Sequence, residues 1–276
     1  MSAFQDIVYQ PGRVARVILN RPGKRNAQSW RLLREMDEAF TAASADENCR
    51  VIVLSGAGGS FSGGHDLDSP EQVTEREAFD RANGSFARAE RYRDVYLDSH
   101  LRWRNLTKPT VAVVQGFCVF GGWMIAAAMD VIFAADDALF IPVYGDYFTA
   151  PWDVGARKAK EILFENRFLT AAEARECGFV SRTVPAGRLD AEAMKYAARV
   201  AENDPALNRT IKFAINQTLD QMGFSASVRA LSPGFDTQIL RERSTAPADG
   251  GPPPQDPRFR GRVQRARGYL REDTGR

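Results

Sequence analysis

Histidine and cysteine are scarce in this sequence, and their scarcity excludes two classes of site. Only two histidines, His65 and His100, occur among 276 residues, and neither belongs to a cluster of histidines and cysteines. A zinc site is therefore not expected. The cysteines, Cys49, Cys118 and Cys177, are odd in number and widely separated. They are interpreted as buried, reduced thiols of a cytosolic protein and not as disulfide bridges or metal ligands.

Long apolar runs and an excess of charge are absent as well. No stretch approaches the roughly 20 apolar residues of a membrane span, because Val111 to Ala135 is interrupted by Gln115, glycines and Asp130. The N-terminal residues lack the basic and apolar regions of a secretory signal. The 37 basic and 35 acidic residues leave a net charge of +2, which favours neither nucleic acid nor a membrane surface as a partner. These features predict a cytoplasmic globular protein.

The segment from Lys108 to Asp130 is predicted to form a strand, a turn and a buried helix. Thr110 to Val114 is a β-branched apolar run, typical of a strand buried on both faces. Glycines precede the apolar run Trp123 to Met129, which contains three consecutive alanines. A helix that begins at Gly121 and Gly122 would direct free N–H groups at an anion. The same glycines are equally compatible with close packing of a buried helix on its strand.

Strands and helices alternate through most of the chain, which indicates an α/β fold with a parallel sheet. Strands are expected at 4–9, 14–19, 51–54, 110–114, 131–134 and 179–184, the first two forming a hairpin. Helices are expected at 27–43, 92–106, 154–165, 170–177, 190–203 and 205–222, and exposed helices within 66–89. Thr170 and Glu173 form a predicted capping box.

The chain is divided into three predicted parts. Residues 1–190 form the α/β core, residues 191–245 form a helical region suited to self-association, and residues 246–276 form a tail rich in proline, glycine and arginine. The tail sequence DGGPPPQD cannot form a helix or a strand. The tail is interpreted as solvated, with an arm that contacts phosphate or wraps a neighbouring subunit as the alternative.

Four segments in order carry a family pattern: LNRPGKRNAQSWRLLREM (19–36), VIVLSGAGGSFSGGHDL (51–67), KPTVAVVQGFCVFGGWMIAAAMD (108–130) and FLTAAEARECGFVSRTVP (168–185). Together they resemble the enoyl-CoA hydratase/isomerase family, the crotonase superfamily. The resemblance implies a spiral of ββα turns with a C-terminal helical trimerisation region. It also implies an acyl-CoA thioester as substrate, coenzyme A only as part of that substrate, and a homotrimer or a dimer of trimers.

The resemblance also implies the site residues. The backbone N–H groups of His65 and Gly121 match the two donors that hold the thioester oxygen as it becomes enolate-like, each worth about 3–4 kcal/mol. Contacts with coenzyme A are implied at Lys24, Arg25, Ala27, Gly63 and Gly64, and the acyl pocket at Phe120, Trp123 and Met124. Any surface Lys-Arg pair would present the same charge as Lys24 and Arg25.

The sequence departs from the family where hydratases carry two glutamates. Met124 occupies the first glutamate position, three residues after Gly121. The loop around the second is shorter, so that its position falls on Tyr144 or, with a shifted deletion, on Asp146. The standard mechanism with two glutamates is therefore not expected, and one or two other groups must transfer protons.

Four residues are candidates for that role, each with a structural alternative. Asp146 ranks first, because partial burial in an aromatic loop would raise the pKa of its carboxyl group; the alternative is a turn residue. Asp153 is the next candidate or an N-cap of the following helix. Tyr144 is the third candidate, as a hydrogen-bond donor; the alternative is a side chain that only packs against its neighbours. The ring of His65 reaches the substrate, or it turns to solvent or to Asp68.

Three functions remain open. The first is an enzyme of the enoyl-CoA hydratase/isomerase type that stabilises a thioester enolate and catalyses hydration, isomerisation or hydrolysis. The second is an acyl-CoA binder without catalysis. The third is a family hydrolase that cleaves a C–C bond of a diketone.

Overall fold

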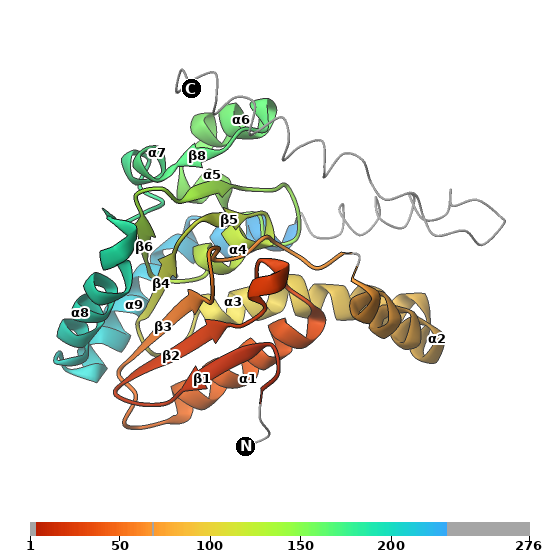
Figure 1. Cartoon of the computed structure of the whole chain (residues 1–276), viewed down its shortest axis with the longest axis horizontal. Helices are drawn as coiled ribbons and strands as arrows, with labels where there is room; N and C mark the ends of the chain where they lie inside the picture. The colour runs from red at the N-terminus through yellow and green to blue at the C-terminus, as the bar shows by residue number, and fades with distance from the viewer. Residues whose placement is uncertain (1–3, 68, 231–276) are drawn as a thin grey trace.

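The computed structural model describes residues 4–67 and 69–230. The predicted tail at 246–276 and the end of the predicted helical region lie outside the described residues. A six-stranded sheet forms the centre of the molecule, in the order β1-β2-β3-β4-β6-β9 (Figure 1). Its strands are Ile7–Gln10, Val14–Leu19, Val51–Gly56, Thr110–Val114, Val131–Ala135 and Arg182–Val184.

The pairing of the sheet confirms the predicted hairpin and the predicted parallel arrangement. β1 and β2 are antiparallel, and every other neighbouring pair is parallel. β4 has the predicted bounds and is buried at all five residues, as its β-branched composition requires. β1 begins at Ile7 rather than Phe4, and β9 at Arg182 rather than Phe179.

A second, three-stranded sheet was not predicted. It contains β5 (Phe117–Val119), β7 (Leu139–Ile141) and β8 (Leu169–Thr170). Strands of two or three residues are too short to show an alternating pattern. This small sheet turns the chain away from β4 and leads it directly into helix α4.

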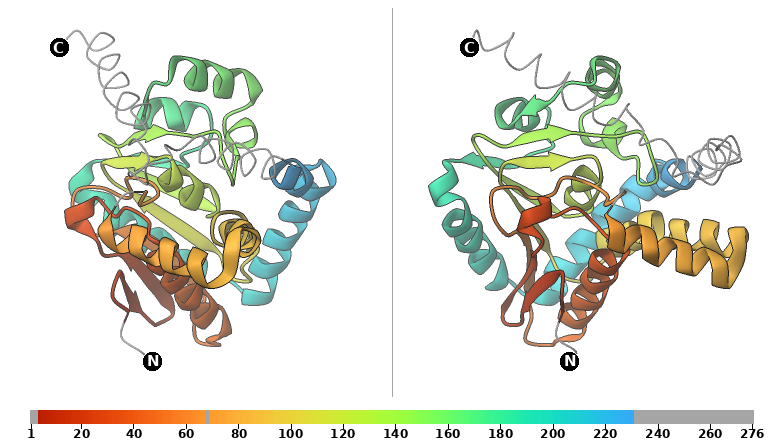
Figure 2. Two further views of the ribbon diagram at one scale, coloured as in Figure 1. Left: turned by 90° about the vertical axis from the view of Figure 1, so that its right-hand side faces the viewer. Right: turned by 45° about the vertical axis from the view of Figure 1, so that its right-hand side comes forward.

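Helices cover both faces of the central sheet. α1 (Trp30–Ala45) packs against β1 and β2, and α8 (Leu189–Ala201) packs against the opposite face (Figure 2). α1 was predicted to begin at Ala27. It begins after Ser29 because the Ser29 hydroxyl oxygen accepts a hydrogen bond from the N–H of Leu32 and caps the helix.

Between β3 and β4 the chain leaves the body of the molecule and returns. α2 (Pro70–Arg93) projects away from the sheet on the side remote from α8 (Figures 1 and 2). Gly84, at φ 79°, breaks its helical geometry. The chain re-enters the body through a π-helical turn, η2 (Asp94–Asp98), and α3 (Ser99–Arg104), which together replace the single helix predicted over 92–106.

The remaining helices are α4 (Gly121–Ala127), α5 (Ala150–Asp153), α6 (Ala156–Glu165), α7 (Ala171–Glu176) and α9 (Pro205–Gln221). The predicted helix over 154–165 is α6, which begins at Ala156 because Gly155, at φ 79°, occupies its N-cap; α5, directly before it, was not predicted. The capping box of Thr170 and Glu173 is confirmed. All three cysteines are free, as predicted. In the part of the chain that the structure describes, no helix is both long and apolar enough to cross a bilayer.

Candidate active site

The structure brings the loop that carries His65 into contact with the first turn of α4. A Cβ atom built on Gly64 would lie 3.3 Å from the Gly121 nitrogen, and one built on Gly121 would lie 2.5 Å from Cδ2 of His65. Within the described residues, neither the N–H of His65 nor that of Gly121 has a hydrogen-bond acceptor. Two free backbone donors, 56 residues apart in the sequence, therefore lie side by side.

The backbone on each side of these donors is constrained. The N–H of Gln28 donates to the carbonyl of Gly64 (2.8 Å), and the N–H of Asp66 donates to the carbonyl of Gln28 (2.9 Å). These two bonds flank His65 and leave its own N–H directed away from Gln28. Phe120, directly before Gly121, is held at φ 54°, a conformation that a residue with a side chain seldom adopts.

A buried ion pair braces the His65 loop from behind. Nη1 of Arg21 lies 2.8 Å from Oδ2 of Asp66, and both side chains are less than a tenth exposed. Asp66 also accepts two hydrogen bonds from Ser69. Although burial acts to raise the pKa of Asp66, the bonds from Ser69 and Arg21 lower it. Asp66 therefore stays charged and braces its loop.

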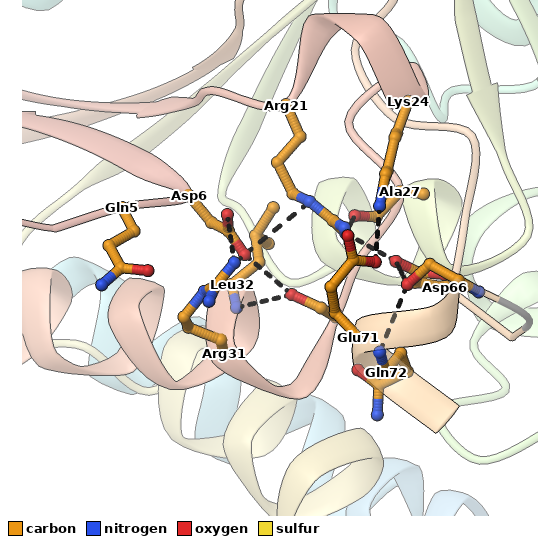
Figure 3. Close-up of polar contacts among 12 residues, drawn as sticks. Gln5, Asp6, Arg21, Lys24, Ala27, Arg31, Leu32, Asp66, Glu71 and Gln72 are labelled. Carbon is orange, nitrogen blue, oxygen red and sulfur yellow. Dashed lines mark hydrogen bonds and ion pairs between the residues drawn. The ribbon is translucent and has the colours of Figure 1, made fainter. Parts of the chain in front are cut away.

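The same arginine links this loop to the start of the chain. Figure 3 shows Arg21 between Asp6 and Asp66, with Arg31 beside Asp6. Arg21 also donates to the carbonyl oxygen of Ala27 at 2.5 Å. These bonds join the loop of residues 21–29 to the loop of residues 63–67, and removal of one partner would leave an uncompensated buried charge.

The residues implied in coenzyme A binding lie at the outer edge of this network. Lys24, in the short helix η1 (Pro22–Lys24), is exposed and forms an ion pair of 2.9 Å with Glu71 of α2 (Figure 3). Arg25 is exposed, and its carbonyl accepts a hydrogen bond from the N–H of Gly63. Ala27 is partly buried, and Gly64 is buried directly before His65. Their role in binding remains a prediction.

The ring of His65 lies inside the protein, and the alternative of a ring turned to solvent is wrong. Its centroid is 4.3 Å from that of Tyr96, and its Nε2 atom is buried without a hydrogen-bond partner. Burial lowers the pKa of His65 to about 4, so the ring is neutral at physiological pH. The other alternative, contact with Asp68, lies outside the described residues.

His100 and Tyr96 join His65 and were missed by the sequence interpretation. Both are buried, and burial shifts the pKa of His100 well below its usual value, with a smaller contribution from His65. Tyr96 and His100 are four positions apart at the junction of η2 and α3, which places them on one helical face. A histidine and a tyrosine at that spacing, in a helix leading to the central strand, are the signal that could have revealed them.

Asp146 lies at the edge of this cluster, in the loop between β7 and α5. Its side chain is buried, with the residue only 3% exposed. Burial raises the pKa of Tyr96, and the charge of Asp146 is one of the smaller contributions in the same direction. Tyr144 is 49% exposed and packs edge to face on Phe148, so the structure does not bring it into the cluster.

Asp153 is not the N-cap of the following helix, and that alternative is wrong. It is the last residue of α5, and Gly155 occupies the N-cap of α6. Its carboxylate accepts hydrogen bonds from Nε1 of Trp123 (2.9 Å) and from the Thr149 hydroxyl (2.5 Å). Burial nevertheless raises its pKa to about 7, which suits a group that exchanges protons near neutral pH.

The raised pKa of Asp153 predicts a dependence of stability on pH. The unfolded chain loses this proton near pH 3.8, whereas the folded protein keeps it up to about pH 7. Protons bound only in the folded state stabilise it, so the free energy of unfolding falls as pH rises through this window. The variant lacks this loss, so we expect Asp153→Asn to be more stabilising at pH 8 than at pH 5, by about 2–3 kcal/mol.

Urea unfolding of Asp153→Asn and wild type at both pH values measures the difference. The asparagine oxygen can still accept from Trp123 and Thr149, so the variant removes only the charge. Asp137→Asn, at an exposed position, serves as the control and should follow wild type. An equal change for wild type and Asp153→Asn between the two pH values would contradict the prediction.

The three residues implied in the acyl pocket are all buried. Met124 lies one turn along α4 from Gly121 and offers no proton-transfer group. Trp123 stacks on Phe179 with ring centroids 3.7 Å apart and planes 3° from parallel. Phe120 packs with Val119, Ile141 and Phe168 in a separate apolar cluster.

No group of three or more potential metal ligands occurs among the residues that the structure describes.

Comparison with known proteins identifies the family. Residues 10–230 match the model of the family described as enoyl-CoA hydratase/isomerase. "Putative enoyl-CoA hydratase EchA13" of Mycobacterium tuberculosis is 38% identical over 247 residues, covering 82% of this chain and 78% of that protein. "Enoyl-CoA hydratase EchA19" of the same organism is 30% identical over 221 residues, covering 77% and 80%.

Solved structures share the fold. An enoyl-CoA hydratase/isomerase from Xanthobacter autotrophicus Py2 superposes with a TM-score of 0.77 at 29% identity, covering 97% of each chain. A structure described as a "probable" enoyl-CoA hydratase from Mycobacterium smegmatis gives a TM-score of 0.75 at 39% identity, covering 86% of this chain and 96% of that one. This chain belongs to the enoyl-CoA hydratase/isomerase family and has the crotonase fold.

Proposed function

We propose that the protein is an acyl-CoA-processing enzyme that stabilises a thioester enolate between the N–H groups of His65 and Gly121. The observation that carries the proposal is the juxtaposition of these two free donors, beside the braced loop. Hydration, isomerisation and hydrolysis of a thioester all place negative charge on one oxygen. Two preorganised donors at that oxygen lower the barrier to each reaction.

Proton transfer is assigned to Asp146. Met124 cannot transfer a proton, and Asp146 is a buried carboxylate whose charge acts on Tyr96, next to the His65 ring. Asp153 is the second candidate, because its pKa of about 7 lies near the operating pH. A single acid can remove a proton from one carbon and return it to another. Coenzyme A enters as part of the substrate, against the surface that carries Lys24 and Arg25.

The proposal includes a homotrimer or a dimer of trimers. α9 carries exposed apolar side chains that a subunit interface would cover: Leu207, Ile211, Phe213 and Ile215. The similar proteins named as enoyl-CoA hydratases support an enzyme over a binder without catalysis. The location of the protein in the cytoplasm also remains a proposal.

Two measurements test the function. Titration calorimetry with butyryl-CoA should show binding, and incubation of the same compound in D2O should show exchange of its α-protons. Exchange requires both the donors and a working base, so binding without exchange would favour the acyl-CoA binder. Turnover of a 1,3-diketone with no binding of any acyl-CoA would favour the C–C bond hydrolase and overturn the proposal.

A further inference from the structure

Gln28 places an acceptor atom without a hydrogen-bond partner, Oε1, beside Gly121, one of the two backbone donors. The side chain is completely buried, and its Nε2 donates to the Ser62 hydroxyl oxygen at 2.9 Å. The single hydroxyl proton of Ser62 is used in a bond to the carbonyl of Asn26 (2.9 Å), so Ser62 can only accept from Gln28. The orientation of the Gln28 amide is therefore fixed. Its Oε1 points away from Ser62 and has no hydrogen-bond partner.

His65 presents a second buried atom to the same place. A Cβ atom built on Gly121 would lie 2.7 Å from Oε1 of Gln28 and 2.7 Å from Nε2 of His65. Both atoms are buried and without a partner in the described structure, and both border the residue whose N–H is a donor of the proposed hole. Each buried polar atom left without a hydrogen bond costs about 1–3 kcal/mol. Two such atoms beside the same glycine indicate a small ligand that complements both.

We propose that Gln28 and His65 hold the water molecule that reacts with the substrate beside the hole. The ligand must be small, neutral and able to donate to the fixed acceptor of Gln28. Water meets these conditions, and it complements Nε2 of His65 in either tautomer, since it can donate or accept. A carboxylate or phosphate does not fit, because Oε1 of Gln28 cannot donate and the His65 ring is neutral. The inference rests on the proposed function.

The step is a balanced addition of water to an enoyl thioester. The water oxygen forms a bond to the β-carbon, and the π electrons move to the thioester oxygen, between the N–H groups of His65 and Gly121. The proton lost by the water passes to Asp146, the proposed proton-transfer group. Asp146 returns that proton to the α-carbon as the enolate collapses. Gln28 and His65 direct the oxygen lone pair at the β-carbon and are not consumed.

Comparison of a reaction that consumes water with one that does not tests this assignment. We expect Gln28→Met to lower the hydration of crotonyl-CoA roughly 100-fold, the cost of a misplaced reactant. Exchange of the α-protons of butyryl-CoA in D2O should change by less than about threefold, because it requires the donors and the base but no bound nucleophile. His65→Phe, which keeps the backbone N–H, should lower the ratio of hydration to exchange in the same direction.

Gln72→Met provides the matched control. Gln72 is also buried, and it accepts a hydrogen bond from the N–H of Trp30, away from the hole. Its replacement should leave the ratio of hydration to exchange as in wild type. Equal loss of both reactions in Gln28→Met would show that Gln28 only braces the hole, and the inference would fail.

Two further results separate this inference from the proposed function. Exchange without any hydration in wild type would overturn the water site and leave the acyl-CoA function in place, whereas absence of acyl-CoA binding would overturn the function itself. Weaker binding of 4-hydroxybutyryl-CoA by Gln28→Met, with normal hydration of crotonyl-CoA, would assign the site to a substrate hydroxyl and overturn its assignment to water.

Discussion

Gly121→Ala is expected to lower kcat/KM for an acyl-CoA by about 100- to 1,000-fold, the cost of losing a preorganised donor at an oxyanion. The added methyl group would lie 2.5 Å from Cδ2 of His65 and 2.7 Å from Oε1 of Gln28. Neither neighbour can yield easily, because Tyr96 packs on the ring of His65 and Ser62 holds the Gln28 amide. The start of α4 must therefore shift, and the N–H of Gly121 moves away from that of His65.

Steady-state kinetics and thermal unfolding of the same samples separate loss of the hole from loss of the fold. Gly59→Ala is the matched control, because a Cβ atom there meets nothing within 4 Å. Gly59 also lies in a glycine-rich loop near the site. It should keep both activity and stability. Full activity of a folded Gly121→Ala variant would exclude the N–H of Gly121 as a donor to the thioester oxygen.

Elements defined by local chemistry were predictable from the sequence. β4 is a buried, β-branched run between Pro109 and Gly116, and its bounds match the prediction. The capping box at the start of α7 was also predicted, because both of its side chains lie within one turn. Asp130, by contrast, pairs with Lys212 of α9 at 2.8 Å, a partner 82 positions away that local sequence does not identify.

Features that depend on distant contacts were not predictable in the same way. The orientation of the His65 ring is set by Tyr96, 31 positions further along the chain, and no local signal specifies that pair. Gln28 directly precedes Ser29, the N-cap of α1, and its local sequence gives no sign of a role in a site. Its significance comes from Ser62 and Gly121, which only the folded chain brings near it.

The two candidate acids, Asp146 and Asp153, also combine a local signal in the sequence with properties that only the folded chain sets. Asp153 directly precedes the helix predicted at 154–165, and the sequence alone suggests a cap. The raised pKa arises because α5 buries the carboxylate against Trp123. Asp146 was ranked first from its aromatic neighbours, and the structure does bury it. Burial, however, accompanies both candidates, so their roles must be separated by measurement.

Asp146→Asn is expected to reduce turnover of an acyl-CoA by about 1,000-fold, within the range for loss of a general acid or base. The amide has nearly the same shape as the carboxyl group but cannot accept a proton at neutral pH. Affinity for the acyl-CoA should stay within a few-fold of wild type, because the proposed binding contacts lie on the surface around Lys24 and on the backbone donors. Exchange of α-protons should fall with turnover, since both need the same base.

Asp153→Asn is the necessary comparison, because it replaces the other buried acid in the same way. If Asp146 transfers the proton, the two variants differ sharply: Asp146→Asn loses turnover and exchange, and Asp153→Asn changes mainly the dependence of stability on pH. Loss of turnover in Asp153→Asn with an active Asp146→Asn would transfer the role to Asp153. In that case the proton would come from the carboxylate that accepts a hydrogen bond from Trp123 of α4, and not from the loop between β7 and α5 that carries Asp146.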